Sequence, residues 1–335
     1  MSFARVSPGL AALALCVPGL AQAQKQFTLS GEEVAVYNLA GTVRISAGSG
    51  GSVTVAVTPG GSDGAKLTFA EGSVRGRNTL RVIYPSDRII FSDMGKGSST
   101  ELSVREDGTF GGDDESRHRN QGGRVRIAGS GSGLEAHASL DISVPEGKSV
   151  NVYLGVGDIT ASNVNGNLRL DTSSGGVDVT GIMGDLSIET GSGDVKVSRV
   201  SGNAVSIDTG SGDVTGTGIK TADLNVDTGS GDVSLSDVTS ENVSIDTGSG
   251  SVNLALTTTV DQLKVDTGSG DVTITLPATL SARVAIETGS GDITTDFPIQ
   301  VRKTGGDELV GTIGSGTGRI AIDTGSGDVK LIKRP

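Results

Sequence analysis

Acidic residues recur at regular spacing along the second half of the chain, and they are the residues best placed to do chemistry. The string Glu-Thr-Gly-Ser-Gly-Asp-Val at 189–195 returns nearly unaltered in six further copies, which start at Asp208, Asp227, Asp246, Asp266, Glu287 and Asp323. Carboxylates in pairs can act as general acid and base, and carboxylate oxygens are the ligands that Ca²⁺ prefers. The string therefore has to be tested against catalysis, metal binding and a purely structural role.

Proteolysis is the first chemistry that the string suggests. The segment Ile207-Asp208-Thr209-Gly210-Ser211 matches the sequence around the catalytic aspartates of aspartic proteases. Those enzymes need two carboxylates that share one proton in a single cleft. Here every repeat carries the same string, so each neighbouring pair would be equivalent, and a structural role accounts for all copies. We expect no catalytic residues and no bound cofactor.

Stacking of the repeats would turn the acidic positions into two columns, and alternation from the apolar Ile188 and Val195 predicts that both face outwards. Unit charges about 4.8 Å apart repel by about 0.9 kcal/mol in water. Hydrogen bonds from the N–H groups of the carboxylates' own turns could offset this repulsion, and Ca²⁺ between the repeats is the alternative. The candidate ligands are Glu189, Asp208, Asp227, Asp266 and Glu287 in one column and Asp194, Asp213, Asp232, Asp271 and Asp292 in the other.

Short β-strands must position these columns. Alternating segments such as Leu186-Ser-Ile188 precede each acid, and segments such as Val195-Lys-Val197 follow each Gly-Ser-Gly turn. The pattern predicts an all-β fold, a parallel β-helix or β-solenoid with coils of about 19 residues. The repeated Thr is expected to point inwards and to bond along the stack. The wide gap before Asp323 is interpreted as two coils with a degenerate copy at Gly314-Ser315-Gly316, and Lys330 and Lys333 are placed on an exposed last strand.

The remaining chain divides by composition. Residues 1–23 hold one basic residue, an apolar run and Ala21-Gln22-Ala23, which predicts a signal peptide cleaved after Ala23 and export through the Sec pathway to the periplasm, the cell surface or the medium. Residues 24–93 are expected to form an irregular, β-rich N-terminal cap, 94–124 a polar flexible loop, and 125–150 a continuation of the cap. Residues 151–335 are expected to form the solenoid.

Composition limits the partners. The chain of 335 residues has 53 glycines, no Trp and a formal net charge of −12. This charge disfavours nucleic acid and anionic membrane surfaces and favours a cationic partner. No segment after residue 24 is apolar enough to cross a membrane. We expect a cell-surface or envelope component as partner, either protein or glycan.

The export signal, the strand-rich block and the repeated Asp-Thr-Gly-Ser-Gly-Asp-Val string resemble the bacterial "putative adhesin" family of domains of unknown function, over about residues 30–332. The resemblance implies a β-solenoid surface or envelope protein without enzymatic activity. A Ca²⁺-binding repeat array and a polysaccharide-active β-helix enzyme are the alternatives. The enzyme would need a unique cleft, yet the chain has only two histidines, His118 in the polar loop and His137 beside a strand.

Overall fold

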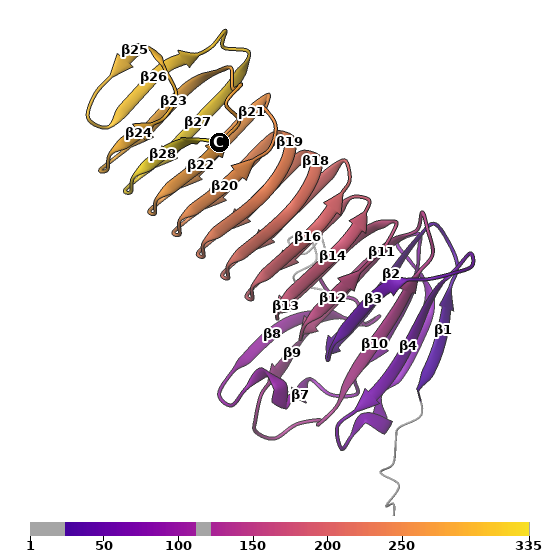
Figure 1. Ribbon diagram of the computed structural model, residues 1–335. Coiled ribbons are helices and arrows are strands. Elements are labelled where there is room, and N and C mark those ends of the chain that lie inside the picture. The colour runs from indigo at the N-terminus through magenta and orange to yellow at the C-terminus, as the bar shows by residue number, and fades with distance from the viewer. Residues whose placement is uncertain (1–23, 112–121, 335) are drawn as a thin grey trace, which may run out of the picture.

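The computed structural model describes residues 24–111 and 122–334. The predicted signal peptide with its cleavage site at Ala23, the residue His118 and the middle of the predicted polar loop lie outside these residues. Two β-sheets pack face to face and form a long, flattened solenoid (Figure 1). The described residues contain no α-helix, only the short 3-10 helices η1 (Gly64–Lys66) and η2 (Ser92–Met94). The predicted all-β, parallel solenoid is confirmed.

We name the two sheets of the solenoid by the face that they form. Sheet 1 carries the repeated Thr, and its strands lie in the spatial order β5 (Thr68–Val74), β6 (Arg77–Ile83), β2 (Glu33–Ala40), β11 (Ser149–Val156), β13 (Asn167–Ser174), β15 (Leu186–Thr190), β17 (Ala204–Thr209), the second halves of β18 (Val214–Thr228) and β19 (Val233–Thr247), β21 (Gln262–Thr267), β27 (Gly318–Thr324), β23 (Ala282–Thr288), β26 (Glu308–Ile313) and β25 (Gln300–Thr304).

Sheet 2 forms the opposite face. Its strands lie in the order β1 (Lys25–Leu29), β4 (Val53–Gly60), β10 (His137–Val144), β3 (Val43–Ala47), β12 (Ile159–Ser162), β14 (Val177–Met183), β16 (Val195–Ser201), the first halves of β18 and β19, β20 (Val252–Leu256), β22 (Val272–Leu276), β28 (Val329–Lys333) and β24 (Ile293–Thr295).

One coil consists of a strand in each sheet and two corners. Along β15 and β16 the buried residues alternate with exposed ones, as in Leu186, Ile188, Val195 and Val197. Alternation of this kind points every second side chain into the space between the sheets. The core is therefore thin across the solenoid and continuous along it, which explains why so few large aromatic residues are needed.

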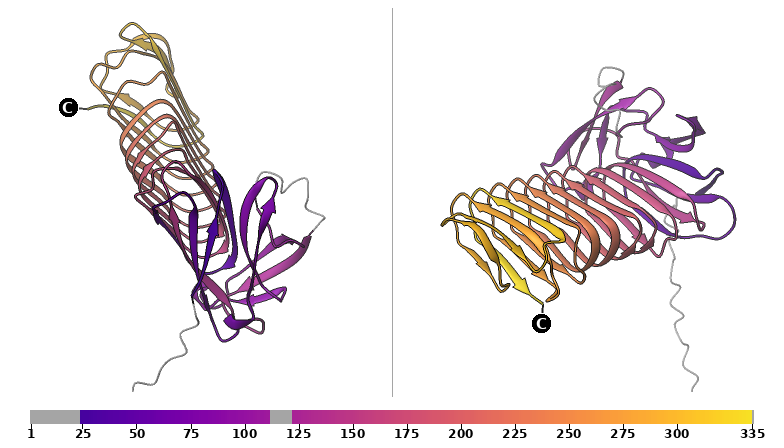
Figure 2. Two further views of the ribbon diagram at one scale, coloured as in Figure 1. Left: turned by 90° about the vertical axis from the view of Figure 1, so that its right-hand side faces the viewer. Right: turned by 90° about the horizontal axis from the view of Figure 1, so that it is seen from above.

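A three-stranded sheet, which we call the flap, lies against the outer face of sheet 1 near the N-terminal end. It consists of β7 (Arg88–Ile90), β9 (Gly122–Ala128) and β8 (Ser99–Arg105), in this order (Figure 2). The predicted loop over 94–124 is thus wrong for Ser99–Arg105, because Leu102 and Val104 alternate within the polar stretch. A Cβ on Gly155 of β11 would lie 2.7 Å from Leu102, so this glycine lets the flap approach closely.

Both ends of the solenoid contain strands that are out of sequence order. Near the N-terminus, β2 lies between β6 and β11, and β3 lies between β10 and β12. Near the C-terminus, β27 lies between β21 and β23, and β28 lies between β22 and β24. The last strand is therefore internal, which contradicts the expectation that Lys330 and Lys333 lie on an exposed final strand.

The segment between β24 and β27 is a cap and not a coil. Strands β25 and β26 form an antiparallel hairpin that continues sheet 1 beyond β23. The predicted degenerate copy at Gly314-Ser315-Gly316 is instead a turn in which the N–H groups of Ser315 and Gly316 both donate to the Ser281 hydroxyl at 3.0 Å. Because β26 runs against β23, the parallel stacking ends there.

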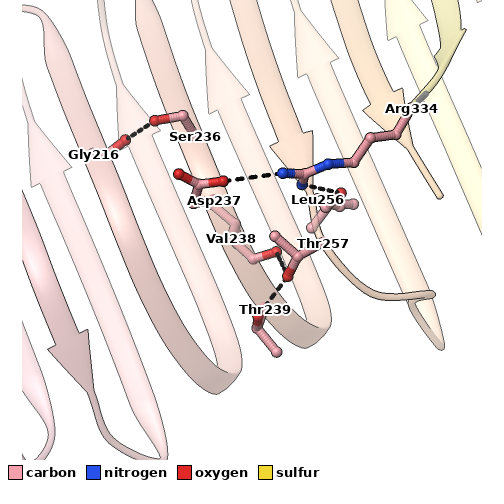
Figure 3. A network of polar contacts seen from close by, with 8 residues as sticks. All are labelled: Gly216, Ser236, Asp237, Val238, Thr239, Leu256, Thr257 and Arg334. Carbon is pink, nitrogen blue, oxygen red and sulfur yellow. Dashed lines mark hydrogen bonds and ion pairs between the residues drawn. The ribbon is translucent and has the colours of Figure 1, made fainter.

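Arg334, which follows β28 directly, ties this intercalated strand to earlier coils (Figure 3). Its backbone N–H donates to Leu276 at 2.8 Å, and its guanidinium reaches the Leu256 carbonyl at 3.3 Å and the Asp237 carboxylate at 3.2 Å. Asp237 has a positive φ of 51°. These contacts cross β22 and β20 to β19, so that the chain end stabilises three coils at one corner.

Candidate functional site

The first predicted column of acids forms a continuous line on the outer face of sheet 1. We call it the outer acid column. Its members are paired in register on neighbouring strands, in the order Glu189, Asp208, Asp227, Asp246, Asp266, Asp323 and Glu287. All are exposed except Asp266, which is half-buried. The prediction from alternation that these carboxylates face outwards is therefore correct, and the structure adds that Asp323 stands between Asp266 and Glu287.

The middle of this column differs from its flanks in its ion pairs. Glu189 is paired with Arg169 at 3.2 Å, and Asp266 is paired with Lys264 at 3.7 Å. Within the described residues, Asp208, Asp227 and Asp246 make no ion pair and accept no hydrogen bond. Partial burial, together with the charges of Asp266 and Asp227, raises the pKa of Asp246 above its ordinary value. Three adjacent carboxylates thus repel one another on a rigid surface.

The second predicted column lies at the corner after the Gly-Ser-Gly turn, and we call it the turn acid column. Here each carboxylate except that of Asp292, the last in the stack, accepts a hydrogen bond from the backbone N–H of the equivalent residue in the neighbouring coil, at 2.8–3.1 Å. The stacking order is Asp194, Asp213, Asp232, Ser251, Asp271, Asp328 and Asp292, and Ser251 interrupts the chain of bonds.

The expected backbone donors are therefore present, but they belong to the neighbouring coil and not to the carboxylate's own turn. The difference has a physical cause. Neighbouring coils stack about 4.8 Å apart, so a carboxylate that points along the stack reaches the backbone N–H of the next coil. A carboxylate that accepts a backbone N–H is stabilised in its charged form. The turn acid column is therefore part of the framework, whereas Asp208, Asp227 and Asp246 of the outer acid column accept no such bond among the described residues.

The repeated Thr side chains are buried beneath the same corner. Thr209, for example, is 1% exposed and donates its hydroxyl to the Gly193 carbonyl of the neighbouring coil at 3.4 Å. The equivalent residues Thr190, Thr228, Thr247, Thr267, Thr324 and Thr288 make the same contact at 3.0–3.4 Å. The expected bonding along the stack thus runs from hydroxyl to backbone and not from hydroxyl to hydroxyl.

At its N-terminal end the outer face of sheet 1 is covered by aromatic residues that the sequence analysis did not single out. The rings of Tyr37 and Tyr153 stack at 4.5 Å on adjacent strands, and Phe110 meets Tyr37 edge-on at 5.8 Å. Burial, with a smaller contribution from Tyr153, raises the pKa of Tyr37 to about 12. The next residue in register is Asp171, which is 9% exposed. The shared Val-Tyr pairs at 36–37 and 152–153 are the sequence signal that could have indicated this stack.

Two further observations concern metals and membranes. Among residues 24–111 and 122–334, no three His, Cys, Asp or Glu side chains converge in a way that could hold a metal ion. The same residues contain no helix with the length and apolar character needed to cross a bilayer.

The histidine that the sequence analysis placed beside a strand lies at the start of β10. His137 packs against Phe91 with ring centroids 5.4 Å apart, and burial lowers the pKa of its imidazole.

Comparison with known proteins places the chain in a family. The model of the Toastrack DUF4097 family matches residues 96–332, which is well over half of the chain. The chain belongs to the Toastrack DUF4097 family. The match begins between β7 and β8 of the flap, ends within the intercalated β28, and thus includes both acid columns.

The other comparisons add little to the Toastrack assignment. A search of curated proteins found no match. Among solved structures, that of a "putative cell adhesion protein" from Clostridium sporogenes is 12% identical, covers 93% of this chain and 99% of that chain, and has a TM-score of 0.26. A likeness of this size does not bear on the function of the Toastrack chain.

Proposed function

We propose that this Toastrack protein is an exported, non-enzymatic scaffold that binds a cationic component of the cell envelope on the outer face of sheet 1. One observation carries the proposal: Asp208, Asp227 and Asp246 are in register on adjacent strands and form no ion pair among the described residues. The neighbouring outward positions are the small polar residues Ser206, Asn225 and Ser244. The surface is thus flat, acidic and repeated.

Repetition favours binding over catalysis. An acid–base mechanism needs two carboxylates whose pKa values differ because their surroundings differ. In the outer acid column, Asp208 and Asp227 each lie between two other carboxylates, so neither of them is distinguished as acid or base. A row of equal charges about 4.8 Å apart instead suits a partner that carries several positive groups, because each positive group can bind one carboxylate in the same way.

The proposal is tested by sedimentation of the mature chain with washed bacterial cell envelopes. A lysine-rich peptide should displace the bound protein, a glutamate-rich peptide of equal length should not, and added salt should weaken binding. Binding that neither peptide nor salt affects would contradict a charge-based role. Release of reducing sugar from an envelope polysaccharide, abolished by an Asp→Asn change in one coil, would show an enzyme instead.

Ca²⁺ is a second candidate ligand of the same column, since a divalent cation between neighbouring carboxylates would relieve the repulsion that raises the pKa of Asp246. The melting temperature of the mature chain in millimolar Ca²⁺ is then expected to exceed that in EDTA. Equal midpoints would reject the ion, and peptide displacement without any Ca²⁺ effect would leave the cationic partner as the ligand.

A further inference from the structure

The C-terminal end of the outer face of sheet 1 has an arrangement of charges that the other coils lack. On β27 the outward residues are Arg319, Ala321 and Asp323, and on β23 they are Arg283, Ala285 and Glu287. The two strands are parallel and pair these residues in register. A basic row and an acidic row therefore run side by side across both strands, with alanines between them. Four residues of strand separate the rows, which corresponds to about 13 Å.

The two rows line adjoining hollows that share Ala285 and Val310. The acidic hollow has a volume of about 240 Å³ and includes Asp323, Glu287 and Glu308. The basic hollow has a volume of about 220 Å³ and is lined by Arg283, Arg302 and Arg319 from three strands. The methyl groups of the alanines leave the floor shallow, so that a flat partner can come close to the backbone.

The three arginines are unusual in a chain of net charge −12. All are exposed, and within the described residues none of them forms an ion pair with a carboxylate. An arginine without a partner can bind a carboxylate with two parallel hydrogen bonds. The basic row can thus bind an anionic group, and the acidic row beside it a cationic one, at a spacing that the two strands fix.

We propose that this bipolar surface is an interface between two copies of the chain. A two-fold axis in the plane of the interface, parallel to the stacking direction and above the alanine row, brings the basic row of each copy over the acidic row of the other. Arg283 then faces Glu287 of the second copy, Arg319 faces Asp323, and the converse pairs form by symmetry. A second copy is the one partner whose charge spacing matches by construction.

The same geometry limits the size of the contact. On the next strand, β21, the residue in the alanine column is Lys264, which would meet its own copy across the axis. Sheet twist separates the two faces further along the stack. The interface is therefore confined to the last strands, is smaller than that of a stable dimer, and is expected to be weak and sensitive to salt. This inference does not depend on the proposed function, because the free aspartates lie on earlier coils.

Analytical ultracentrifugation of the mature chain at about 0.1 M salt tests the proposal, since the overall repulsion is largely screened there. The wild type should show a concentration-dependent monomer–dimer equilibrium. In Arg283→Glu/Arg319→Glu the dissociation constant should rise at least about tenfold. The control Arg44→Glu/Lys196→Glu makes the same charge change on sheet 2 and should associate like the wild type. A wild type that stays monomeric, or a first variant that associates normally, would overturn the proposal.

A mixing experiment distinguishes this interface from any other. The variant Glu287→Arg/Asp323→Arg has two basic rows and should also be monomeric, with the same far-ultraviolet circular dichroism and melting temperature as the wild type. Mixed in equal amounts with Arg283→Glu/Arg319→Glu, it should form a heterodimer, because two basic rows then face two acidic rows. Two folded variants that fail to associate would overturn the two-fold arrangement.

Discussion

Gly231 occupies a turn where two neighbouring coils approach closely, and its replacement by alanine should destabilise the solenoid more than a change of one methyl group normally does. The φ of this residue is 147°, a conformation that only glycine adopts freely. A Cβ would lie 2.1 Å from the carbonyl oxygen of Gly212 and 2.6 Å from its carbon. Ordinary contact distances exceed these values by at least about 1 Å, so the two coils would have to separate.

The cost can be estimated from the bonds that such a separation breaks. Gly212 donates to Ser230 at 3.0 Å and Val214 donates to Asp232 at 2.9 Å, and both bonds join the same two coils. Each bond contributes about 1 kcal/mol net, and a disfavoured backbone conformation adds about 1–3 kcal/mol. Gly231→Ala should therefore lower the free energy of unfolding by about 3–5 kcal/mol, measured by urea denaturation followed by circular dichroism.

Three other glycines separate the contributions. Gly51 is open on all sides, so Gly51→Ala should change stability by less than about 0.5 kcal/mol. Gly218 has a φ of 66°, but an added Cβ would have no atom nearer than 3.7 Å, so Gly218→Ala should show only the cost of the disfavoured backbone conformation. Gly248 has an ordinary φ, but an added Cβ would lie 2.5 Å from a carbonyl oxygen, so Gly248→Ala should show only the cost of the steric clash. A loss at Gly231 no larger than that at Gly218 would refute the close stacking of the turns.

Further predictions concern the charged and aromatic residues. Asp246→Asn should stabilise the protein at neutral pH by at most about 0.5 kcal/mol, because partial burial and the neighbouring carboxylates make Asp246 harder to ionise in the folded than in the unfolded chain, while solvent screens the repulsion at this exposed site. Thermal melts should show this gain disappearing as the pH falls through the raised pKa to the ordinary value of 3.8. Arg334→Ala should lower the free energy of unfolding by about 1 kcal/mol, since it removes a largely exposed ion pair and the hydrogen bond from the guanidinium to the Leu256 carbonyl. Lys333→Ala should have little effect in the same melts. Phe110→Ala should uncover Tyr37 and lower its pKa from about 12 towards 10, which ultraviolet titration of the phenolate measures.

Each of these expectations has an outcome that contradicts it. A gain from Asp246→Asn that persists in acid would show that charge is not its origin. Equal losses from Arg334→Ala and Lys333→Ala would show that the guanidinium does not tie the coils together. An unchanged phenolate titration after Phe110→Ala would mean that the Phe110 ring does not control the burial of Tyr37.

The coil itself could be predicted from sequence because every signal for it is local. Alternation around Ile188 and Val195 fixes which side chains point inwards, and the Gly-Ser-Gly turns fix where the strands end. The order of the coils could not be predicted in the same way. Identical strings fit every neighbouring position equally well, so nothing in the copy at Asp323 states that it lies between the coils of Asp266 and Glu287. The long gap before that copy was the only sign.

The candidate site was predictable to a similar degree. Alternation placed both acid columns on the outside, but it did not distinguish them. The distinction arises from the axial distance between coils, which brings the backbone N–H of Asp213 to the carboxylate of Asp194 and leaves Asp208 without a donor. The position of the flap could not be predicted for the same reason. Leu102 lies against Gly155, and these two residues are far apart in the sequence. Contacts between residues far apart in sequence carry no local pattern.

The central claim, that the middle of the outer acid column is the binding surface, is tested most directly by comparing two variants with equal charge. Asp208→Asn/Asp227→Asn/Asp246→Asn neutralises the outer acid column, and Asp194→Asn/Asp213→Asn/Asp232→Asn neutralises the turn acid column while keeping an oxygen that can accept the N–H of the neighbouring coil. Affinity for the same washed cell envelopes should fall at least about tenfold in the first variant and remain near the wild-type value in the second. Equal affinities of the two folded variants would contradict the claim.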